Sequence, residues 1–240
     1  MANQPLRVLL NRPRARVSRL EWQGRRIWLK RPETRSSLRW RLQKGDPARA
    51  FRRELDGLGA LAKAGMPVPQ VLDQGADFLF LADAGRTLDA MLADPGTPPE
   101  LASEGASEAV QAAARVLARL HRQGMAHGRP YLRDLCWDGA QVTLIDFERY
   151  RTRAGALRQG ADLVMFLGSL LARPAGGAHL HPAIAAYRMA APDRTLRAAR
   201  IWLACLTPLG PIARLVCRLK PHNREVAGYL RLVEQRAALR

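Results

Sequence analysis

Residues 127–148 read HGRPYLRDLCWDGAQVTLIDFE, and this stretch decides the fold. A polar loop fills its first eight positions and ends in Asp134. Two short apolar segments, 135–137 and 142–146, follow, and an Asp-Gly pair between them favours a turn. The pattern predicts a loop and then a strand hairpin whose second strand ends in Asp146.

The aspartate at the end of this strand is the central feature. An ionised carboxylate at the end of a buried strand is costly unless it is paired or binds a cation. Magnesium bound to phosphate is one such cation, since it takes one or two protein carboxylates together with phosphate oxygens. The alternative is an aspartate that caps a turn, because aspartate is common in turns. Asp146 by itself does not separate the two.

The spacing upstream of Asp146 favours the magnesium site. The catalytic loop of protein kinases is written His-Arg-Asp, four residues and Asn, which puts the asparagine seven positions after the histidine. His127 and Asp134 are also seven positions apart. The hairpin then places Asp146 where kinases keep the aspartate of their Asp-Phe-Gly triplet, written here Asp146-Phe147-Glu148.

Two residues nearer the N-terminus match the nucleotide side of such a site. Lys30 ends an apolar strand, like the lysine of the Val-Ala-Ile-Lys strand of kinases, and it is one of only four lysines in the chain. A helix predicted to begin at Asp46-Pro47 places Glu54 on its apolar face. A carboxylate on a buried face needs a cation, so Lys30 is the expected partner. An arginine on the same helix is the alternative.

With these pieces in order, residues 15–171 resemble the lipopolysaccharide kinase family, the Kdo and heptose kinases of Gram-negative bacteria. The stretch 127–148 is the most specific part of the resemblance. The resemblance implies a bilobal protein-kinase-like fold, the use of ATP and Mg²⁺, and phosphorylation of a sugar in the inner core of lipopolysaccharide. It also implies action at the cytoplasmic face of the inner membrane, so the expected location is cytoplasmic or peripheral at that membrane.

The resemblance also gives individual residues their expected roles. These residues are Lys30 and Glu54 for ATP binding, Asp146 and Asp134 for the metal, and His127, Arg129 and Asp134 for catalysis. Within the catalytic loop, His127 is expected to hold the loop to the aspartate strand rather than to act as a base. Asp162 is expected either to brace this loop by hydrogen bonds or to cap the helix that follows.

The chain departs from the family pattern at three places. Arg129 stands where kinases put the catalytic-base aspartate, and an arginine cannot act as a base at neutral pH. Asp134 replaces the usual asparagine but can still bind magnesium. The turn near residues 11–16 lacks the glycines that allow close approach of backbone to phosphate, although its arginines can attract phosphate.

Three functions fit this pattern. The first is a kinase in which Arg129 stabilises the transferring group, because phosphoryl transfer depends on positioning and charge stabilisation. The second is a pseudokinase that binds nucleotide without transferring phosphate. The third is a binding or regulatory module for lipopolysaccharide precursors or another phosphate-rich partner.

The order of the predicted elements gives an α+β fold with two lobes. Residues 1–84 are expected to form a small N-lobe with an antiparallel sheet and one helix. Residues 85–240 are expected to form a larger, mostly helical C-lobe that contains the catalytic loop. Residues 95–106, rich in proline, glycine, serine and alanine, are predicted to be a loop. Large aromatic side chains are expected in the core, namely Trp28, Trp137 and Phe166.

Charge narrows the choice of partner. The chain of 240 residues has 39 basic and 21 acidic residues, a net charge of +18, which favours nucleic acid, anionic lipid or phosphorylated sugars. Aromatic residues make up only 6% and no nucleic-acid-binding module is visible, so nucleic acid is the weakest of these. The basic residues from Arg200 to Arg240 are predicted to be either a solvated helical face or a surface for an anionic membrane.

Cysteine usage and hydropathy bear on the compartment. Cys136, Cys205 and Cys217 form no disulfide framework and no paired metal spacing, which is typical of reduced thiols in the cytosol. The N-terminus shows no apolar core of signal-peptide length. The longest apolar run, Ile201–Ala213, contains two prolines and is too short to span a bilayer. We therefore expect a soluble or peripheral protein.

Overall fold

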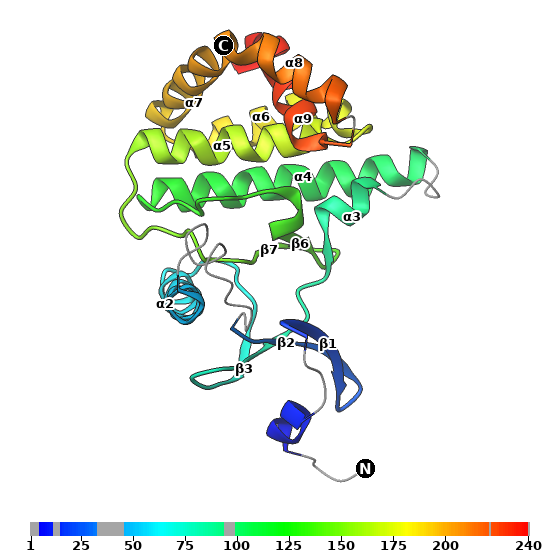
Figure 1. Cartoon of the computed structure of the whole chain (residues 1–240), viewed down its shortest axis with the longest axis vertical. Coiled ribbons are helices and arrows are strands. Elements are labelled where there is room, and N and C mark those ends of the chain that lie inside the picture. The colour runs from blue at the N-terminus through cyan, green and yellow to red at the C-terminus, as the bar shows by residue number, and fades with distance from the viewer. Residues whose placement is uncertain (1–4, 12–14, 33–45, 94–98, 221, 240) are drawn as a thin grey trace.

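A small antiparallel sheet lies at one end of the molecule and a group of helices at the other (Figure 1). The computed structural model describes residues 5–11, 15–32, 46–93, 99–220 and 222–239. A second, smaller sheet lies between the two ends. The predicted α+β fold, with a small sheet lobe and a larger helical lobe, is confirmed.

The larger sheet has four antiparallel strands in the order β1-β2-β4-β3. They are β1 (Val17–Trp22), β2 (Arg25–Lys30), β3 (Val71–Gln74) and β4 (Leu79–Ala82). A hairpin joins β1 to β2, and both residues of its turn, Gln23 and Gly24, have the positive φ that a tight hairpin favours. Strand β3 was not predicted; it is short, has no buried residue and pairs with β4 through an irregular register.

One helix, α2 (Pro47–Lys63), accompanies this sheet. Asp46 caps it by accepting a hydrogen bond from the amide of Ala48, and Pro47 occupies the first turn. Its buried face contains Phe51, Leu58 and Leu61, with Glu54 among them. The predicted helix is therefore confirmed, and its apolar face carries one carboxylate into the interior.

The second sheet has the order β5-β6-β7, formed by β5 (Arg86–Thr87), β6 (Leu135–Trp137) and β7 (Val142–Leu144). Between β5 and β6 the chain forms the helices α3 (Leu88–Ala93) and α4 (Pro99–Arg122). The loop predicted over 95–106 is therefore wrong from residue 99 onward, and 94–98 lie outside the described residues. Glutamate, leucine and alanine favour a helix there, and a single Gly105 within it is tolerated.

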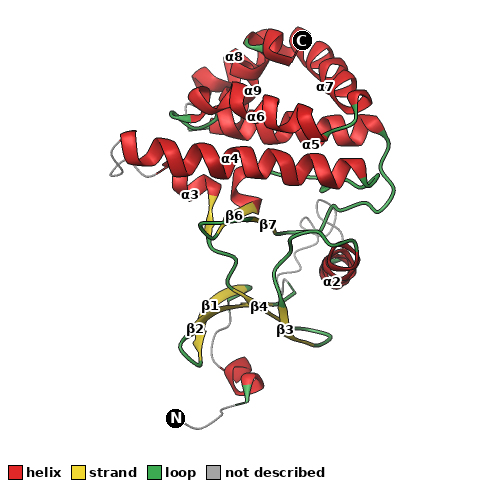
Figure 2. Cartoon of the chain, turned by 180° about the vertical axis from the view of Figure 1, so that it is seen from behind, coloured by secondary structure: helices red, strands yellow, loops and turns green. Residues whose placement is uncertain are grey.

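The remaining helices form the far end of the molecule (Figure 2). They are α5 (Ala156–Leu171), α6 (Gly176–Ala190), α7 (Asp193–Leu206), α8 (Gly210–Leu219) and α9 (Arg224–Glu234), with the short 3-10 turns Leu6–Asn11, Leu132–Asp134, Thr207–Leu209 and Arg236–Leu239. α5 packs against α6, α7 and α9, and α4 packs against α6. Fully buried side chains such as Phe166, Leu167 and Tyr187 fill this core. The core is therefore a rigid support for the loops between these helices and the larger sheet.

Candidate nucleotide and metal site

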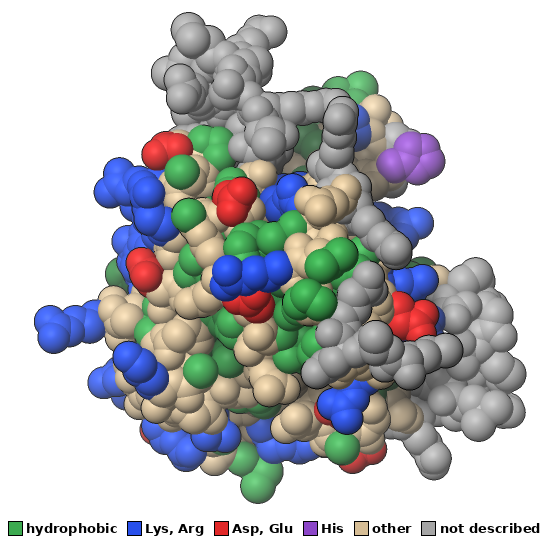
Figure 3. Space-filling model, turned by 90° about the horizontal axis from the view of Figure 1, so that it is seen from below, with side chains coloured by type: hydrophobic (Ala, Val, Ile, Leu, Met, Phe, Trp, Pro, Cys, Tyr) green, Lys and Arg blue, Asp and Glu red, His purple; other side chains and the backbone are tan. Residues whose placement is uncertain are grey.

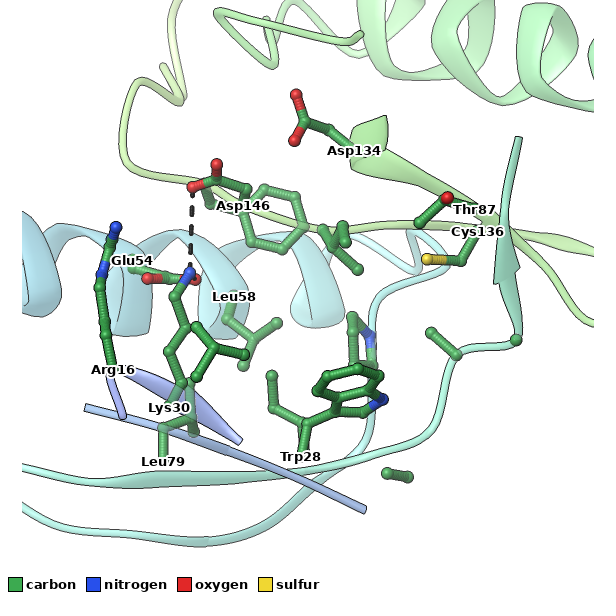
Figure 4. A pocket seen from close by; sticks show the side chains of 18 residues that line it. Arg16, Trp28, Lys30, Glu54, Leu58, Leu79, Thr87, Asp134, Cys136 and Asp146 are labelled. Atoms are coloured by element: carbon green, nitrogen blue, oxygen red, sulfur yellow. Dashed lines mark hydrogen bonds and ion pairs between the residues drawn. The ribbon is translucent and has the colours of Figure 1, made fainter. Parts of the chain in front are cut away.

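The β6–β7 hairpin brings two distant aspartates together. Asp134 directly precedes β6, and Asp146 follows β7 by two residues. The antiparallel register pairs Leu135 with Leu144, and the amide of Ile145 donates to the carbonyl of Asp134 at 3.0 Å. Both carboxylates therefore emerge at the same end of the hairpin, facing the cleft between the lobes (Figure 4).

Asp146 is held in an unusual backbone conformation. Its φ is 66°, in the left-handed region that residues other than glycine seldom adopt. Burial acts to raise the pKa of Asp146, but the positive charges of Lys30 and Arg129 outweigh it and hold that pKa below its ordinary value. The carboxylate is thus ionised, yet its Oδ1 is buried without a hydrogen-bond partner among the described residues. A cation would satisfy such an oxygen.

Asp134 carries a second oxygen of the same kind. Burial and the negative charge of Asp146 raise the pKa of Asp134 to about 7, while Arg129 lowers it in part. Its Oδ2 is also buried without a hydrogen-bond partner in the described structure. Two adjacent carboxylates with unsatisfied buried oxygens fit Mg²⁺, which binds oxygen ligands and relieves the repulsion between like charges.

Arg129 lies between these two carboxylates. Its Nη2 donates to Oδ2 of Asp146, and its Nε lies 3.7 Å from Oδ2 of Asp134. The nearby carboxylates outweigh the effect of burial and raise the pKa of Arg129 further, so the guanidinium keeps its charge. The loop position that carries the base in protein kinases therefore carries, in this chain, a fixed cation that touches Asp146 and lies close to Asp134.

Lys30 and Glu54 form an ion pair between β2 and α2. Both side chains are largely buried, and the ammonium of Lys30 also lies 3.9 Å from Oδ1 of Asp146 (Figure 4). Burial raises the pKa of Glu54, and the charge of Lys30 opposes that rise. The partner of Glu54 is therefore Lys30 and not an arginine of the same helix. The pair joins the sheet, the helix and Asp146.

A cavity of about 310 Å³ adjoins these charges. Its far part is apolar, and it is lined by Trp28, Leu79, Leu81, Ala82, Ala84, Gly85, Cys136 and Ile145 among others. Trp28, predicted to be a core residue, lies on the cavity wall because it is two residues from Lys30 on the same strand and so shares its face. Its Nε1 donates to Oδ1 of Asp83 at 2.7 Å. Trp137 and Phe166 are buried as predicted.

Asp162 braces the loop that contains Arg129 and Asp134. Helix α5 begins at Ala156, so Asp162 lies inside the helix, and the idea that it caps the helix is wrong. Its carboxylate accepts from the amides of His127 at 2.7 Å and Gly128 at 2.9 Å, and it is almost fully buried. His127 in turn contacts the carbonyl of Ile145 through Nε2 at 3.0 Å. The loop is thereby tied to both α5 and the strand that leads to Asp146.

A further carboxylate, Glu148, lies close to Glu54 and Asp146. Ligand atoms of Glu54, Asp146 and Glu148 lie within 4.8 Å of one another. Glu54 and Glu148 are already ion-paired, with Lys30 and Arg16 respectively, so a metal ion there would displace two cations. Asp134 and Asp146 also lie beside cations, but each has a buried oxygen without a hydrogen bond, and they occupy the positions that hold the metal in kinases.

Arg16 links the lobes through Glu148, a contact that sequence reasoning did not include. It is the described member of the arginines predicted to attract phosphate in the turn near 11–16. Residues 12–14 of that turn lie outside the described part of the chain. An exposed pair of this kind contributes little to stability, but it places a positive charge at the mouth of the cavity.

Comparison with known proteins agrees with this geometry. Residues 81–187 match the model of the lipopolysaccharide kinase (Kdo/WaaP) family. These residues belong to that family. The lipopolysaccharide kinase segment contains Arg129, Asp134 and Asp146, but Lys30 and Glu54 lie outside it. Their place beside Asp146 comes from the structure.

Two individual proteins are similar to longer parts of the chain than this segment. An uncharacterized protein of Haemophilus influenzae is 31% identical over 159 residues, which cover 65% of this chain. The aligned part spans 62% of that relative, less than two thirds of its length. A solved structure described as WaaP in complex with acyl carrier protein is 19% identical, covering 92% of this chain and 83% of that chain, with a TM-score of 0.47. The similarity to the lipopolysaccharide kinase family therefore rests on residues 81–187.

Proposed function

We propose that this chain is a kinase that transfers the γ-phosphoryl group of ATP, with Mg²⁺, to a sugar hydroxyl in the inner core of lipopolysaccharide. The observation that supports it best is the Lys30–Glu54 ion pair, which lies beside Asp146 at the polar end of an apolar cavity. A lysine for the phosphates, a glutamate that holds it and an aspartate for the metal are the parts that phosphoryl transfer requires in kinases.

The chain's own residues divide the work as follows. The apolar walls around Trp28 and Leu81 receive the adenine ring of ATP. Lys30 contacts the phosphates, and Glu54 holds the ammonium of Lys30 in place. Asp134 and Asp146 hold Mg²⁺, which neutralises charge on the phosphates when it is bound. Asp162 and His127 keep the loop that carries Arg129 and Asp134 against the metal-binding strand.

Arg129 replaces the base in this proposal. The acceptor oxygen forms a bond to the γ-phosphorus, the bond to the leaving oxygen of ADP breaks, and the hydroxyl proton passes to water. Because the transition state is loose and its charge lies on phosphoryl oxygens, a nearby cation contributes more than a base does. Asp146 would hold Mg²⁺ through Oδ1, the oxygen that lacks a hydrogen bond, while Arg129 contacts Oδ2, so the guanidinium would stay beside the metal and close to the transferring group.

The acceptor class and the location are part of the same proposal. The family of residues 81–187 and the net charge of +18 both favour a phosphate-rich, anionic acceptor such as a lipopolysaccharide precursor. Such an acceptor is anchored in lipid, so we place the reaction at the cytoplasmic face of the inner membrane.

Transfer of labelled phosphate from ATP to purified lipopolysaccharide core acceptors tests the proposal. The parent chain should label the acceptor in the presence of Mg²⁺. Asp146→Asn and Lys30→Ala should abolish labelling, whereas Lys63→Ala, an exposed lysine on α2, should leave it unchanged. Labelling that survives Asp146→Asn would remove the mechanism.

A nucleotide-binding pseudokinase is the second candidate, favoured by the contact of Arg129 with the metal-binding aspartate. It predicts that Mg-ATP raises the melting temperature, since a ligand that binds only the folded state stabilises it. It also predicts that no acceptor is labelled. The absence of a melting shift in the parent chain would exclude both the kinase and the pseudokinase and leave a binding module.

A further inference from the structure

Exposed apolar side chains line the outer side of α7, the turn after it and α8. Five of them are between 50% and 72% exposed, namely Ile201, Leu209, Ile212, Leu215 and Leu219. On α8, Ile212, Leu215 and Leu219 follow one another at steps of three and four, so they form one stripe. A contiguous apolar stripe at the surface marks an interaction site more often than scattered residues do.

The opposite side of α7 is part of the core. Leu196, Ala199 and Leu203 are buried, and α7 packs against α5. The helix is therefore anchored by its inner side, and its apolar outer side is left over after the core is complete. We call the exposed surface formed by residues 194–220 of these helices the α7–α8 face.

The charge of this face has one sign. Residues 194–224 contain no aspartate or glutamate, and they contain seven basic residues: Arg194, Arg197, Arg200, Arg214, Arg218, Lys220 and Arg224. Arg214 and Arg218 are one turn apart on α8 and are exposed beside the apolar stripe. At the sheet end of the molecule, by contrast, basic side chains are scattered around the outline with acidic ones among them (Figure 3).

A hollow of about 340 Å³ adds a place for an anion beside α7. It is lined by Arg188 of α6 and by Arg197 and Arg200 of α7, together with Asp193 and Leu196. Arg197 lies one helical turn before Ile201, so the hollow borders the apolar side chains. Three guanidinium groups around an open hollow suit a phosphate group.

The shape of this region indicates contact with a membrane surface rather than a span. Within the described residues, the helical stretch 193–219 is long and apolar enough to cross a membrane by length and composition, with 11% of its window buried. This helical stretch is longer than the apolar run Ile201–Ala213 on which the sequence-based expectation rested. However, Pro208 and Pro211 lie where α7 ends and α8 begins. The chain bends there, so the two helices run in different directions (Figure 1).

We propose that the α7–α8 face binds the surface of an anionic lipid bilayer. The apolar stripe enters the boundary between head groups and acyl chains, and the arginines beside it contact lipid phosphates, as amphipathic helices do in membrane interfaces. Trp202, 40% exposed on α7, adds an aromatic residue of the kind that favours this depth. This inference goes beyond phosphoryl transfer and does not depend on it.

Sedimentation with lipid vesicles tests the proposal with the full chain. The parent chain should bind vesicles of phosphatidylcholine with phosphatidylglycerol at least about tenfold more tightly than vesicles of phosphatidylcholine alone, and added salt should release it. Changing Arg214 and Arg218 together to glutamine should weaken binding by about tenfold or more, since each basic residue contributes about a factor of five near such a surface. Changing Ile212, Leu215 and Leu219 to glutamine should abolish it.

Matched variants separate this surface from total charge and from catalysis. Arg52→Gln with Arg53→Gln, exposed on α2, removes the same charge elsewhere and should leave binding nearly unchanged. Asp146→Asn should bind vesicles like the parent, so a failure of the kinase proposal does not affect this result. Circular dichroism should show that all variants keep their helices.

Three outcomes would overturn the proposal. One is no binding to anionic vesicles, and another is equal, salt-independent binding to both kinds of vesicle. The third is binding of soluble polyglutamate through Arg214 and Arg218 without any binding to vesicles, which would assign the face to an acidic protein instead.

Discussion

The guanidinium of Arg129 donates a hydrogen bond to the carboxylate of Asp146. Arg129 is the residue at which the chain departs most from protein kinases, and Asp146 is the residue that matches them best. Their contact means that the departure is not isolated from the rest of the site. A cation at the base position neutralises part of the negative charge of the carboxylate that would bind magnesium, so the two cations repel each other across Asp146.

Arg129→Ala should therefore strengthen magnesium binding while weakening the fold. Without the guanidinium, Asp146 loses a hydrogen bond and the buried Asp134 loses an ion pair. The free energy of unfolding should therefore fall by about 1–3 kcal/mol in EDTA. Titration calorimetry with Mg²⁺ should show a higher affinity than in the parent chain, because the positive charge that opposes the metal beside Asp134 and Asp146 is gone. Arg129→Lys keeps the charge, and its Mg²⁺ affinity should lie between those of the parent chain and Arg129→Ala.

The repulsion between the two cations has a clear contrary result. If Arg129→Ala binds Mg²⁺ more weakly than the parent, the guanidinium supports the metal site instead of opposing it. Phosphate transfer is a separate readout. In the kinase proposal, Arg129→Ala should lose transfer even though its metal affinity rises.

Asp134→Asn should change stability in a pH-dependent way. The pKa of Asp134 is raised to about 7 in the folded chain, chiefly by burial, against an ordinary value of 3.8. A raised pKa means that the protonated form favours folding, so this contribution is full below about pH 4 and is lost as pH rises through about 7. Asparagine stays neutral, and the variant should exceed the parent at pH 8 by on the order of 2–4 kcal/mol.

Thermal unfolding in EDTA at pH 5 and pH 8 measures this difference. The advantage of Asp134→Asn at pH 5 should be less than about half of its value at pH 8, because the folded parent is mostly protonated at pH 5 and ionised at pH 8. Asp56→Asn, an exposed change on α2, serves as the control and should show no such dependence. An equal advantage at both pH values would mean that the charge of Asp134 is not the cause.

Asp162→Ala should be among the most destabilising single changes in the helical lobe. The amides of His127 and Gly128 both donate to this buried carboxylate, and its loss leaves both unsatisfied. Each costs about 1–3 kcal/mol, so the free energy of unfolding should fall by about 2–6 kcal/mol. Asp162→Asn keeps one acceptor and should lose less.

Urea unfolding compares these variants with Asp56→Ala, whose exposed carboxylate should matter by less than about 0.5 kcal/mol. A loss at Asp162 no larger than that at Asp56 would show that the catalytic loop holds its shape without this brace. Mg-ATP should also stabilise Asp162→Ala less than the parent, because the loop carries Asp134.

Much of the site was predictable because its residues belong to periodic elements. Alternation along β2 and helical spacing in α2 place Lys30 and Glu54 toward one interior, and a buried charge then requires its partner. The hairpin spacing likewise predicted the meeting of Asp134 and Asp146. These are local patterns with one physically acceptable outcome.

The features that were missed depend on contacts between elements. Asp162 lies inside α5 because the helix begins six residues earlier at Ala156, where Gly155 offers no side-chain cap as a signal. Strand β3 forms because β4 offers it a free edge, and its own sequence carries little strand pattern. The bond between Arg129 and Asp146 requires the loop and the hairpin to be folded together, so no spacing in the chain predicts it.

Gly85 and Gly59 should respond to alanine in opposite directions. Gly85 borders the cavity with a φ of +90°, and a Cβ atom built there would lie 2.2 Å from the carbonyl oxygen of Trp137. The strained conformation and the clash with backbone should lower the free energy of unfolding by about 2–4 kcal/mol. Gly59 lies on the exposed side of α2 with nothing within 4 Å of its Cβ position, so Gly59→Ala should stabilise the chain by about 0.5–1 kcal/mol.

The two variants also separate stability from ligand binding at the cavity. Because Gly85 and Trp137 join the cavity wall to β6, Gly85→Ala should reduce the rise in melting temperature that Mg-ATP produces, whereas Gly59→Ala should keep it in full. Urea unfolding and thermal shift on the same samples measure both effects. A Gly85→Ala chain with unchanged stability would show that β6 moves away from the new methyl group at little cost, and that the backbone around Gly85 is not rigid.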